Sequence, residues 1–266
     1  MSDTTITSVR NPRVQAAAGL RERRERDRQQ RILIDGEREL ARALDAGVRA
    51  VEVFHCLENT ADKGSAALLA RLAATEAVSI AVAPHVFQRV AYGERSTGLV
   101  AVAETPDASL NRLKLPDIPL IGVIEGCEKP GNLGAVLRSA DAAGLSAVIV
   151  ADGGTDLFNP NVIRASLGTV FTMPVAVAPA ADVLQFLRAH KLAMIAARVD
   201  ANRDYTQVDY RTATAIILGS EAHGLSTAWH AADVIAVRLP MLGVADSLNV
   251  SATAAVLFYE ALRQRT

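Results

Sequence analysis

The chain has 266 residues, of which 50% are hydrophobic and 21% are charged, and its formal net charge is −1. These values are typical of a globular protein with one or two domains. No apolar run reaches the roughly 18–20 residues needed to span a bilayer, and residues 1–6 lack a signal-peptide pattern. Cys56 and Cys127 match no metal-binding spacing, so we expect two reduced core thiols in a cytoplasmic protein.

Residues 21–31 concentrate positive charge, with six arginines against three acidic residues. One interpretation is a solvated helix face with ion pairs at i,i+3 and i,i+4 spacing. The other is a surface that binds RNA phosphates, because arginine makes bidentate contacts with phosphate. The second interpretation predicts RNA contacts from arginines in this segment and just before it, namely Arg10, Arg13, Arg23, Arg24 and Arg28.

Strand and helix patterns alternate over residues 1–104 and predict a small α/β domain. A polar turn with Tyr92 and Arg95 interrupts them, and it is either an ordinary loop or an RNA-facing one. Residues 105–119 hold three prolines, which is linker composition and predicts a domain boundary. The expected strands are 32–35, 48–54, 78–82 and 98–103, and the expected helices are 37–46, 66–74 and a short one from Pro84.

Residues 120–266 are predicted to form a second α/β domain with a mostly parallel sheet. Its first strand, 120–125, is apolar enough to be buried on both faces. A glycine-rich turn follows at 129–134, where Asn132 can cap the next helix, and Arg138 lies six residues further along. The later patterns predict strands at 147–151 and 194–199, and helices at 159–168, 182–190 and 250–262.

Two stretches near the C-terminus have the composition of ligand-binding turns. Residues 216–225 pass from an apolar strand into Gly-Ser-Glu, and residues 239–251 pass from Leu-Pro-Met to Ser-Leu-Asn. Open α/β sheets bind ligands at strand ends of this kind, so we expect the backbone of both turns to hold a flat heterocycle. The fingerprints G-x-G-x-x-G and G-x-x-x-x-G-K are absent, which argues against a nucleotide-binding oxidoreductase.

Three motifs taken together resemble those of the SpoU class of RNA ribose 2′-O-methyltransferases. They are Asn-x-Gly-x-x-x-Arg, then Gly-x-Glu-x-x-Gly-Leu, then apolar-Pro-Met followed by Ser-Leu-Asn-Val-Ser, and their order and spacing fit residues 120–263. The segment 164–174 is also similar to this family. The matching residues, in motif order, are Asn132, Gly134 and Arg138; Gly219, Glu221, Gly224 and Leu225; and Leu239–Met241 with Ser247–Ser251.

The resemblance implies a fold and a set of partners. It implies a deep trefoil knot in residues 120–266, S-adenosylmethionine bound in the knotted loops, and a homodimer with the site near the subunit interface. Residues 11–13 and 33–37 resemble the ribosomal-protein-L30e-like RNA-binding domain often attached to this class. That separate domain favours 23S ribosomal RNA as the substrate. A tRNA substrate, or a non-catalytic RNA-binding protein with the same fold, remain the alternatives.

The implied reaction moves a methyl group from a sulfonium to a ribose 2′-hydroxyl held in line with it. By resemblance, Arg138 lies nearest that hydroxyl, and we expect it to bind the adjacent phosphate and stabilise developing negative charge. Glu221 is expected to steady Arg138 or Asn249, while Ser247 and Asn249 shape the methionine end of the pocket.

The implied site residues fall into three groups, and no cluster of His, Cys and carboxylate residues has the spacing of a metal site. The catalytic group is Asn132, Arg138, Glu221, Ser247 and Asn249. The cofactor-binding group is Ala197, Leu218, Gly219, Leu239, Met241 and Leu248. Arg95 and Arg164 join the five N-terminal arginines as expected RNA contacts.

Overall fold

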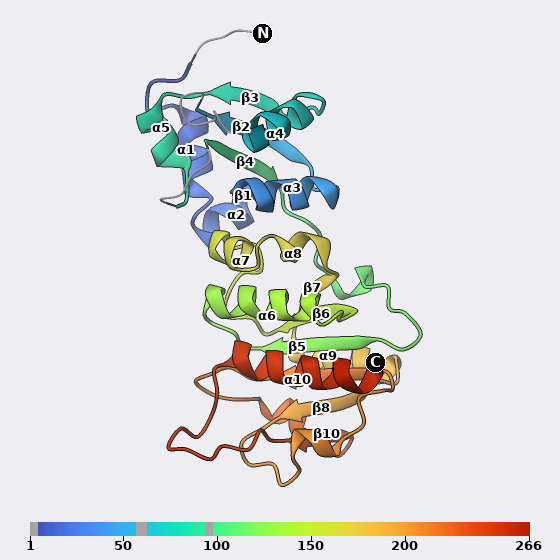
Figure 1. The fold of residues 1–266 in the computed structure, drawn as a ribbon. Coiled ribbons are helices and arrows are strands. Elements are labelled where there is room, and N and C mark those ends of the chain that lie inside the picture. The colour runs from blue at the N-terminus through green and yellow to red at the C-terminus, as the bar shows by residue number, and fades with distance from the viewer. Residues whose placement is uncertain (1–4, 57–62, 94–97) are drawn as a thin grey trace. The chain divides into compact units, whose positions relative to one another are not determined.

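The computed structural model describes residues 5–56, 63–93 and 98–266, and they form two compact units (Figure 1). Unit 1 comprises Met1–Pro106 and Phe158–Thr172, and unit 2 comprises Asp107–Leu157 and Met173–Thr266. Both units mix helices and strands, as the sequence predicts. The sequence also predicts that every residue after 119 belongs to the second domain, whereas the segment 158–172 packs with unit 1.

The described part of unit 1 forms a four-stranded sheet in the order β1-β4-β2-β3. Strand β4 runs antiparallel to β1 and β2, while β2 and β3 run parallel. Its core is aliphatic and aromatic, with Leu33, Phe54 and Phe87 almost fully buried. The elements are α1 (Pro12–Gly19), α2 (Arg23–Gln29), β1 (Arg31–Asp35), α3 (Glu37–Asp45), β2 (Ala50–His55), α4 (Lys63–Ala73), β3 (Val78–Ala81), α5 (Pro84–Val90), β4 (Leu99–Glu104), α7 (Pro160–Ala165) and α8 (Thr169–Thr172).

Helices α7 and α8 are held within unit 1 by polar contacts. The guanidinium of Arg164 on α7 lies 4.0 Å from the carboxylate of Asp35 at the end of β1. Asp35 also accepts the N–H groups of Tyr92 at 2.6 Å and Gly93 at 3.2 Å. Burial raises the pKa of the Asp35 carboxyl, although these hydrogen bonds oppose the shift. A Cβ on Gly93 would overlap the Arg164 guanidinium, so a glycine leaves room for that side chain.

Unit 2, whose residues are all described, forms a six-stranded sheet in the order β10-β8-β9-β5-β6-β7. Every neighbouring pair is parallel, which confirms the predicted sheet. The chain first moves outward from β5 to β7 and then returns to the other side of β5. The elements are β5 (Leu120–Glu125), α6 (Pro130–Ala142), β6 (Ala147–Ala151), β7 (Val175–Ala178), α9 (Ala180–Ala189), β8 (Ala193–Ala197), β9 (Thr214–Leu218), β10 (Val234–Val237) and α10 (Val250–Arg265), with short 3-10 turns η2 (Leu110–Arg112), η3 (Tyr205–Gln207) and η4 (Thr227–His230).

Helices cover both faces of this sheet. Alternate residues of β5 point to opposite faces, so Ile121 and Val123 join the core beneath α9 and η4. Gly122 faces the other way, where a Cβ would lie 2.9 Å from the ring of Phe258 on α10. Helices α6 and α10 pack against each other (Figure 1). None of the helices in the described ranges has the length and apolarity needed to span a bilayer.

The arrangement of the strands brings particular loops together. Because parallel strands end at one edge of the sheet, the loops after β5, β8, β9 and β10 all leave from that edge. The change of direction beside β5 is a topological switch point, the place where open α/β sheets bind ligands. The fold therefore directs attention to the carboxyl edge of unit 2.

Candidate active site

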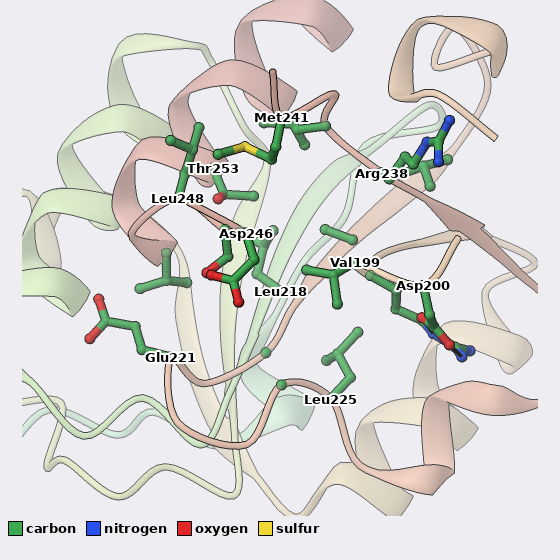
Figure 2. Close-up of a pocket in the computed structure, with 18 of the residues that line it drawn as sticks. Val199, Asp200, Leu218, Glu221, Leu225, Arg238, Met241, Asp246, Leu248 and Thr253 are labelled. Atoms are coloured by element: carbon green, nitrogen blue, oxygen red, sulfur yellow. Dashed lines mark hydrogen bonds and ion pairs between the residues drawn. The ribbon is translucent and has the colours of Figure 1, made fainter. Parts of the chain in front are cut away.

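A cleft of about 760 Å³ opens at the carboxyl edge of the unit 2 sheet (Figure 2). Its walls come from the loops that follow β8, β9 and β10 and from the first turn of α10. Figure 2 shows Met241 and Leu248 beside Thr253 of α10, with Val199 and Leu225 across from them. Three loops separated in sequence thus enclose one space.

The structure places all six residues predicted to bind the cofactor on this cleft. Leu218 is buried at the end of β9, whereas Leu248 keeps 43% of its surface exposed although it is apolar. Two of the predicted catalytic residues, Glu221 and Ser247, line the same space. The six cleft residues are Ala197, Leu218, Gly219, Leu239, Met241 and Leu248.

The turn after β9 is closed by its own backbone. Ser220 donates its N–H to the carbonyl of Gly224 at 3.1 Å and accepts the N–H of Gly224 at 3.0 Å. Gly224 has φ +66°, a conformation that glycine adopts without strain. A Cβ on Gly219 would lie 2.2 Å from the carbonyl carbon of Gly224. The turn therefore requires glycine at both positions, and it presents Glu221 between them.

Glu221 is the centre of a polar cluster that joins the three motifs. Its Oε1 accepts hydrogen bonds from the side-chain amides of Asn132 and Asn249, both at 2.6 Å. Its Oε2 lies 2.8 Å from the Nζ of Lys129. The Oδ1 of Asn249 caps α10 by accepting the N–H of Ser251 at 2.8 Å. Asn132 and Glu221 also line a second cavity of about 180 Å³.

The position of Asn132 corrects one prediction. The sequence suggests that Asn132 caps the helix after the glycine-rich turn, but α6 begins two residues earlier, at Pro130. Proline favours the first position of a helix, so Lys129 becomes the cap residue and makes no side-chain capping bond. Asn132 lies in the first turn of α6, where its side chain is free to bond with Glu221.

Arg138 does not join this cluster. It is exposed on α6 and lines neither cavity. Its guanidinium makes no hydrogen bond or ion pair with any residue that the structure describes. Of the two contacts predicted for Glu221, the structure contains the one to Asn249 and not the one to Arg138.

Two titratable groups beside the cluster keep their protons at neutral pH. The hydrogen bond and charge of Glu221 raise the pKa of the Lys129 ammonium. Burial raises the pKa of the Cys127 thiol, which lines the smaller cavity. Neither group is therefore a general base at neutral pH. Among the described residues, no group of three or more His, Cys, Asp or Glu side chains could hold a metal ion.

The sequence analysis missed several residues of this region. Val199 is 74% exposed on the cleft, and the ion pair of Arg198 with Asp200, 2.6 Å from Nη2 to Oδ2, lies beside it. These residues directly follow β8, so the rule that ligands bind at strand ends was enough to select them. Lys129 and Glu125 carry no such signal, because their contacts depend on the folded chain.

The predicted RNA-contacting arginines lie in unit 1, and most have acidic neighbours. Arg13 lies 3.6 Å from Glu52, Arg23 lies 3.7 Å from Asp27, and Arg28 pairs with Glu25. Arg10 and Arg24 are exposed, Arg164 pairs with Asp35, and Arg95 lies outside the described residues. Arg26 is buried and donates to the carbonyl of Leu20 at 2.7 Å, so it belongs to the core. RNA contact by the exposed arginines stays a prediction.

Comparison with known proteins identifies the family. Residues 119–259, more than half of the chain, match the sequence profile of the SpoU rRNA methylase family. The chain belongs to the SpoU rRNA methylase family. Residues 11–101 match the profile of the MRM3-like substrate binding domain, which agrees with an N-terminal RNA-binding domain. The predicted resemblance is confirmed.

Similar proteins span almost the whole of this SpoU-family chain. The 23S rRNA (uridine(2479)-2′-O)-methyltransferase of Streptomyces viridochromogenes is 32% identical over 98% of this chain and 92% of its own length. A crystal structure of an RNA 2′-O ribose methyltransferase is 43% identical, with a TM-score of 0.85 over 98% of this chain and 99% of that one. The SpoU methyltransferase AviRb from Streptomyces viridochromogenes, solved with AdoMet, is 29% identical, with a TM-score of 0.88 over 96% and 98%. The predicted enzyme class and cofactor, an S-adenosylmethionine-dependent RNA 2′-O-methyltransferase, are therefore confirmed.

Proposed function

We propose that this protein methylates a ribose 2′-hydroxyl of 23S ribosomal RNA in the cleft at the carboxyl edge of unit 2. The observation that carries this proposal is the position of the cleft beside the Asn132–Glu221–Asn249 cluster. The relative from Streptomyces viridochromogenes acts on 23S rRNA, and it matches both units of this chain. A ribosomal substrate implies a cytoplasmic location.

The residues of the cleft suit S-adenosylmethionine. Leu218, Leu239 and Leu248 offer apolar surface for a flat purine, and the tightly closed turn at Gly219 brings backbone close to the cleft. Leu248 leaves 43% of its surface uncovered, which fits an apolar surface that a ligand covers. When bound, the cofactor supplies a methyl group already activated by its sulfonium charge.

Within the cluster, Glu221 acts as an organiser rather than a base. Both of its oxygens already accept hydrogen bonds or an ion pair, from Asn132, Asn249 and Lys129. The carboxylate therefore fixes the two amides, and these amides orient polar groups of the substrate. Ser247 lines the cleft on the loop that leads to Asn249, where it would contact the methionine part of the cofactor.

Arg138 is the residue we assign to the RNA phosphate beside the target ribose. Its guanidinium is exposed and has no partner among the described residues, so it is free to bind an incoming phosphate. There it would hold the ribose in line and stabilise negative charge that develops on the 2′-oxygen.

The exposed arginines of α2 are expected to contribute to RNA affinity. Reversing Arg23, Arg24 and Arg28 to glutamate should weaken RNA binding and reduce its salt dependence by roughly 0.7 for each lost phosphate contact to a single strand. Titration of a 23S rRNA fragment at several salt concentrations measures this slope. Reversing Arg211, an exposed arginine of unit 2 that pairs with Asp209, controls for net charge. Unchanged affinity in the triple variant would remove α2 from the RNA-binding surface.

The decisive test of the proposed function maps the methylated nucleotide. Ribosomal RNA from cells with and without the protein is digested and analysed by mass spectrometry, and one ribose methyl in 23S rRNA is expected to disappear. Purified protein with labelled S-adenosylmethionine should restore the same methyl on unmodified rRNA. A methyl gained on tRNA instead, or none at all, would contradict the proposal.

We also propose a trefoil knot in unit 2 and a homodimer with the site near its interface, as the family resemblance implies. Light scattering coupled to size exclusion tests the dimer, which should have twice the 28.2 kDa mass of the chain. A strictly monomeric and active enzyme would exclude it.

A further inference from the structure

Glu125 is a buried carboxylate that the chemistry described so far does not use. It is the last residue of β5, and only 5% of its surface is exposed. A buried carboxylate is costly unless hydrogen bonds satisfy it, so the groups that surround it are informative. Glu125 receives its donors from a single segment of the chain, the loop that follows β9.

Three donors converge on this carboxylate. The N–H of Ser226 donates to Oε2 at 2.7 Å, and the Ser226 hydroxyl donates to Oε1 at 2.7 Å. The indole Nε1–H of Trp229 donates to Oε1 at 2.9 Å, and the Trp229 side chain is fully buried. Hydrogen bonds to a charged acceptor are stronger than neutral ones, so Glu125 holds Ser226 and Trp229 firmly.

The loop held by Glu125 is the one that carries Glu221. Strands β5 and β9 are neighbours, with Ile124 paired to Leu218. The chain leaves the sheet at Leu218, forms the turn with Glu221, and returns to Glu125 at Ser226. Both ends of the loop are thus fixed beside each other at the sheet edge. The loop residues between them form one wall of the cleft.

We propose that Glu125 is a positioning residue for methyl transfer, which anchors the far end of the 219–230 loop and so sets both the cleft wall and the place of Glu221. This inference rests on the proposed function, because it takes the cleft to be the cofactor site. A purely structural residue at this point would stabilise the unit without affecting the cofactor.

Glu125→Gln provides the test because it preserves shape and removes only acceptor capacity. Whichever way the carboxamide turns, its NH₂ group faces the N–H of Ser226 or the indole N–H of Trp229, and neither can accept a hydrogen bond. We expect the dissociation constant for S-adenosylmethionine, measured by calorimetry, to rise at least ten-fold. Trp229 is the only tryptophan of the chain, so acrylamide quenching of its fluorescence should increase in the cofactor-free variant.

Two further variants keep the test decisive. Ser226→Ala removes one of the three donors and should weaken cofactor binding about three-fold even if Glu125→Gln does not fold. Thr214→Val removes a buried hydroxyl at the opposite end of β9, where it donates to the carbonyl of Thr212 at 2.8 Å. This matched control should lower the unfolding midpoint without changing cofactor affinity.

The outcomes separate this inference from the proposed function. If the wild-type protein binds no S-adenosylmethionine, the proposed function fails, while quenching of Trp229 in the variants still tests the anchor. Cofactor affinity and quenching that stay at wild-type values in Ser226→Ala and in folded Glu125→Gln would overturn the inference. The same loss of affinity in Thr214→Val would also overturn it, since general destabilisation would then explain the effect.

Discussion

Replacing Arg138 with alanine is expected to abolish methyl transfer while leaving cofactor binding intact. The side chain is exposed on α6, outside both cavities, and bonds to no other described residue. Its removal therefore leaves the cleft unchanged. Loss of one group that stabilises charge in a transition state typically lowers the rate about 10²–10³-fold, and loss of phosphate positioning adds to this effect.

Single-turnover transfer of a labelled methyl group to rRNA measures the rate, and calorimetry measures cofactor affinity. Arg138→Lys should fall between wild type and alanine, because lysine keeps the charge without the bidentate geometry. Arg188→Ala is a matched control, since Arg188 is also exposed in unit 2 but pairs with Asp233. Cofactor affinity that declines in step with activity would assign Arg138 a structural role instead.

The sheet of unit 2 illustrates what the sequence can predict. Strands β5 and β6 are continuous apolar runs, and every residue in them is buried. A run of this kind is readable because a strand between two helical layers has no polar face. Strand β7 was not predicted, since it has four residues of which one is exposed, and it follows two short helices closely.

Polar positions of the site were harder to predict because their partners are distant in sequence. The cap at Asn249 is local and readable, as the first turn of α10 begins one residue later. The cap suggested for Asn132 was wrong because Pro130 starts α6 earlier, which leaves Asn132 to bond with Glu221. Lys129 carries no local signal for its contact with Glu221, because the two residues meet only through the pairing of β5 with β9.

The segment 158–172 shows the same limit at the level of domains. Its sequence matches the family profile together with the rest of unit 2, so a boundary drawn from composition includes it there. Its packing against unit 1 depends on Arg164 beside Asp35 and on Arg42, which donates to the carbonyl of Leu167 at 2.6 Å. Contacts between residues so far apart in the chain leave no periodic pattern that a single sequence could reveal.

Gly219→Ala is expected to remove most of the cofactor affinity, through the backbone alone. The added methyl carbon would lie 2.2 Å from the carbonyl carbon of Gly224 and 2.5 Å from the nitrogen of Leu225. Backbone atoms cannot rotate away as a flexible side chain can, so the turn must open and the cleft wall must move. Forcing extra volume into a closed turn costs about 1–3 kcal/mol, and each 1.4 kcal/mol lost from binding lowers affinity about ten-fold.

Calorimetry with S-adenosylmethionine measures this loss, and chemical denaturation shows how much stability declines with it. Gly243→Ala is the matched control, because Gly243 lies in the loop after β10 and its added carbon meets no atom within 4 Å. We expect Gly243→Ala to bind as wild type does, and Gly219→Ala to bind about ten-fold more weakly or worse. Equal affinity in the two variants would mean that the turn tolerates expansion, and that the second motif requires glycine for a reason other than the shape of the cleft.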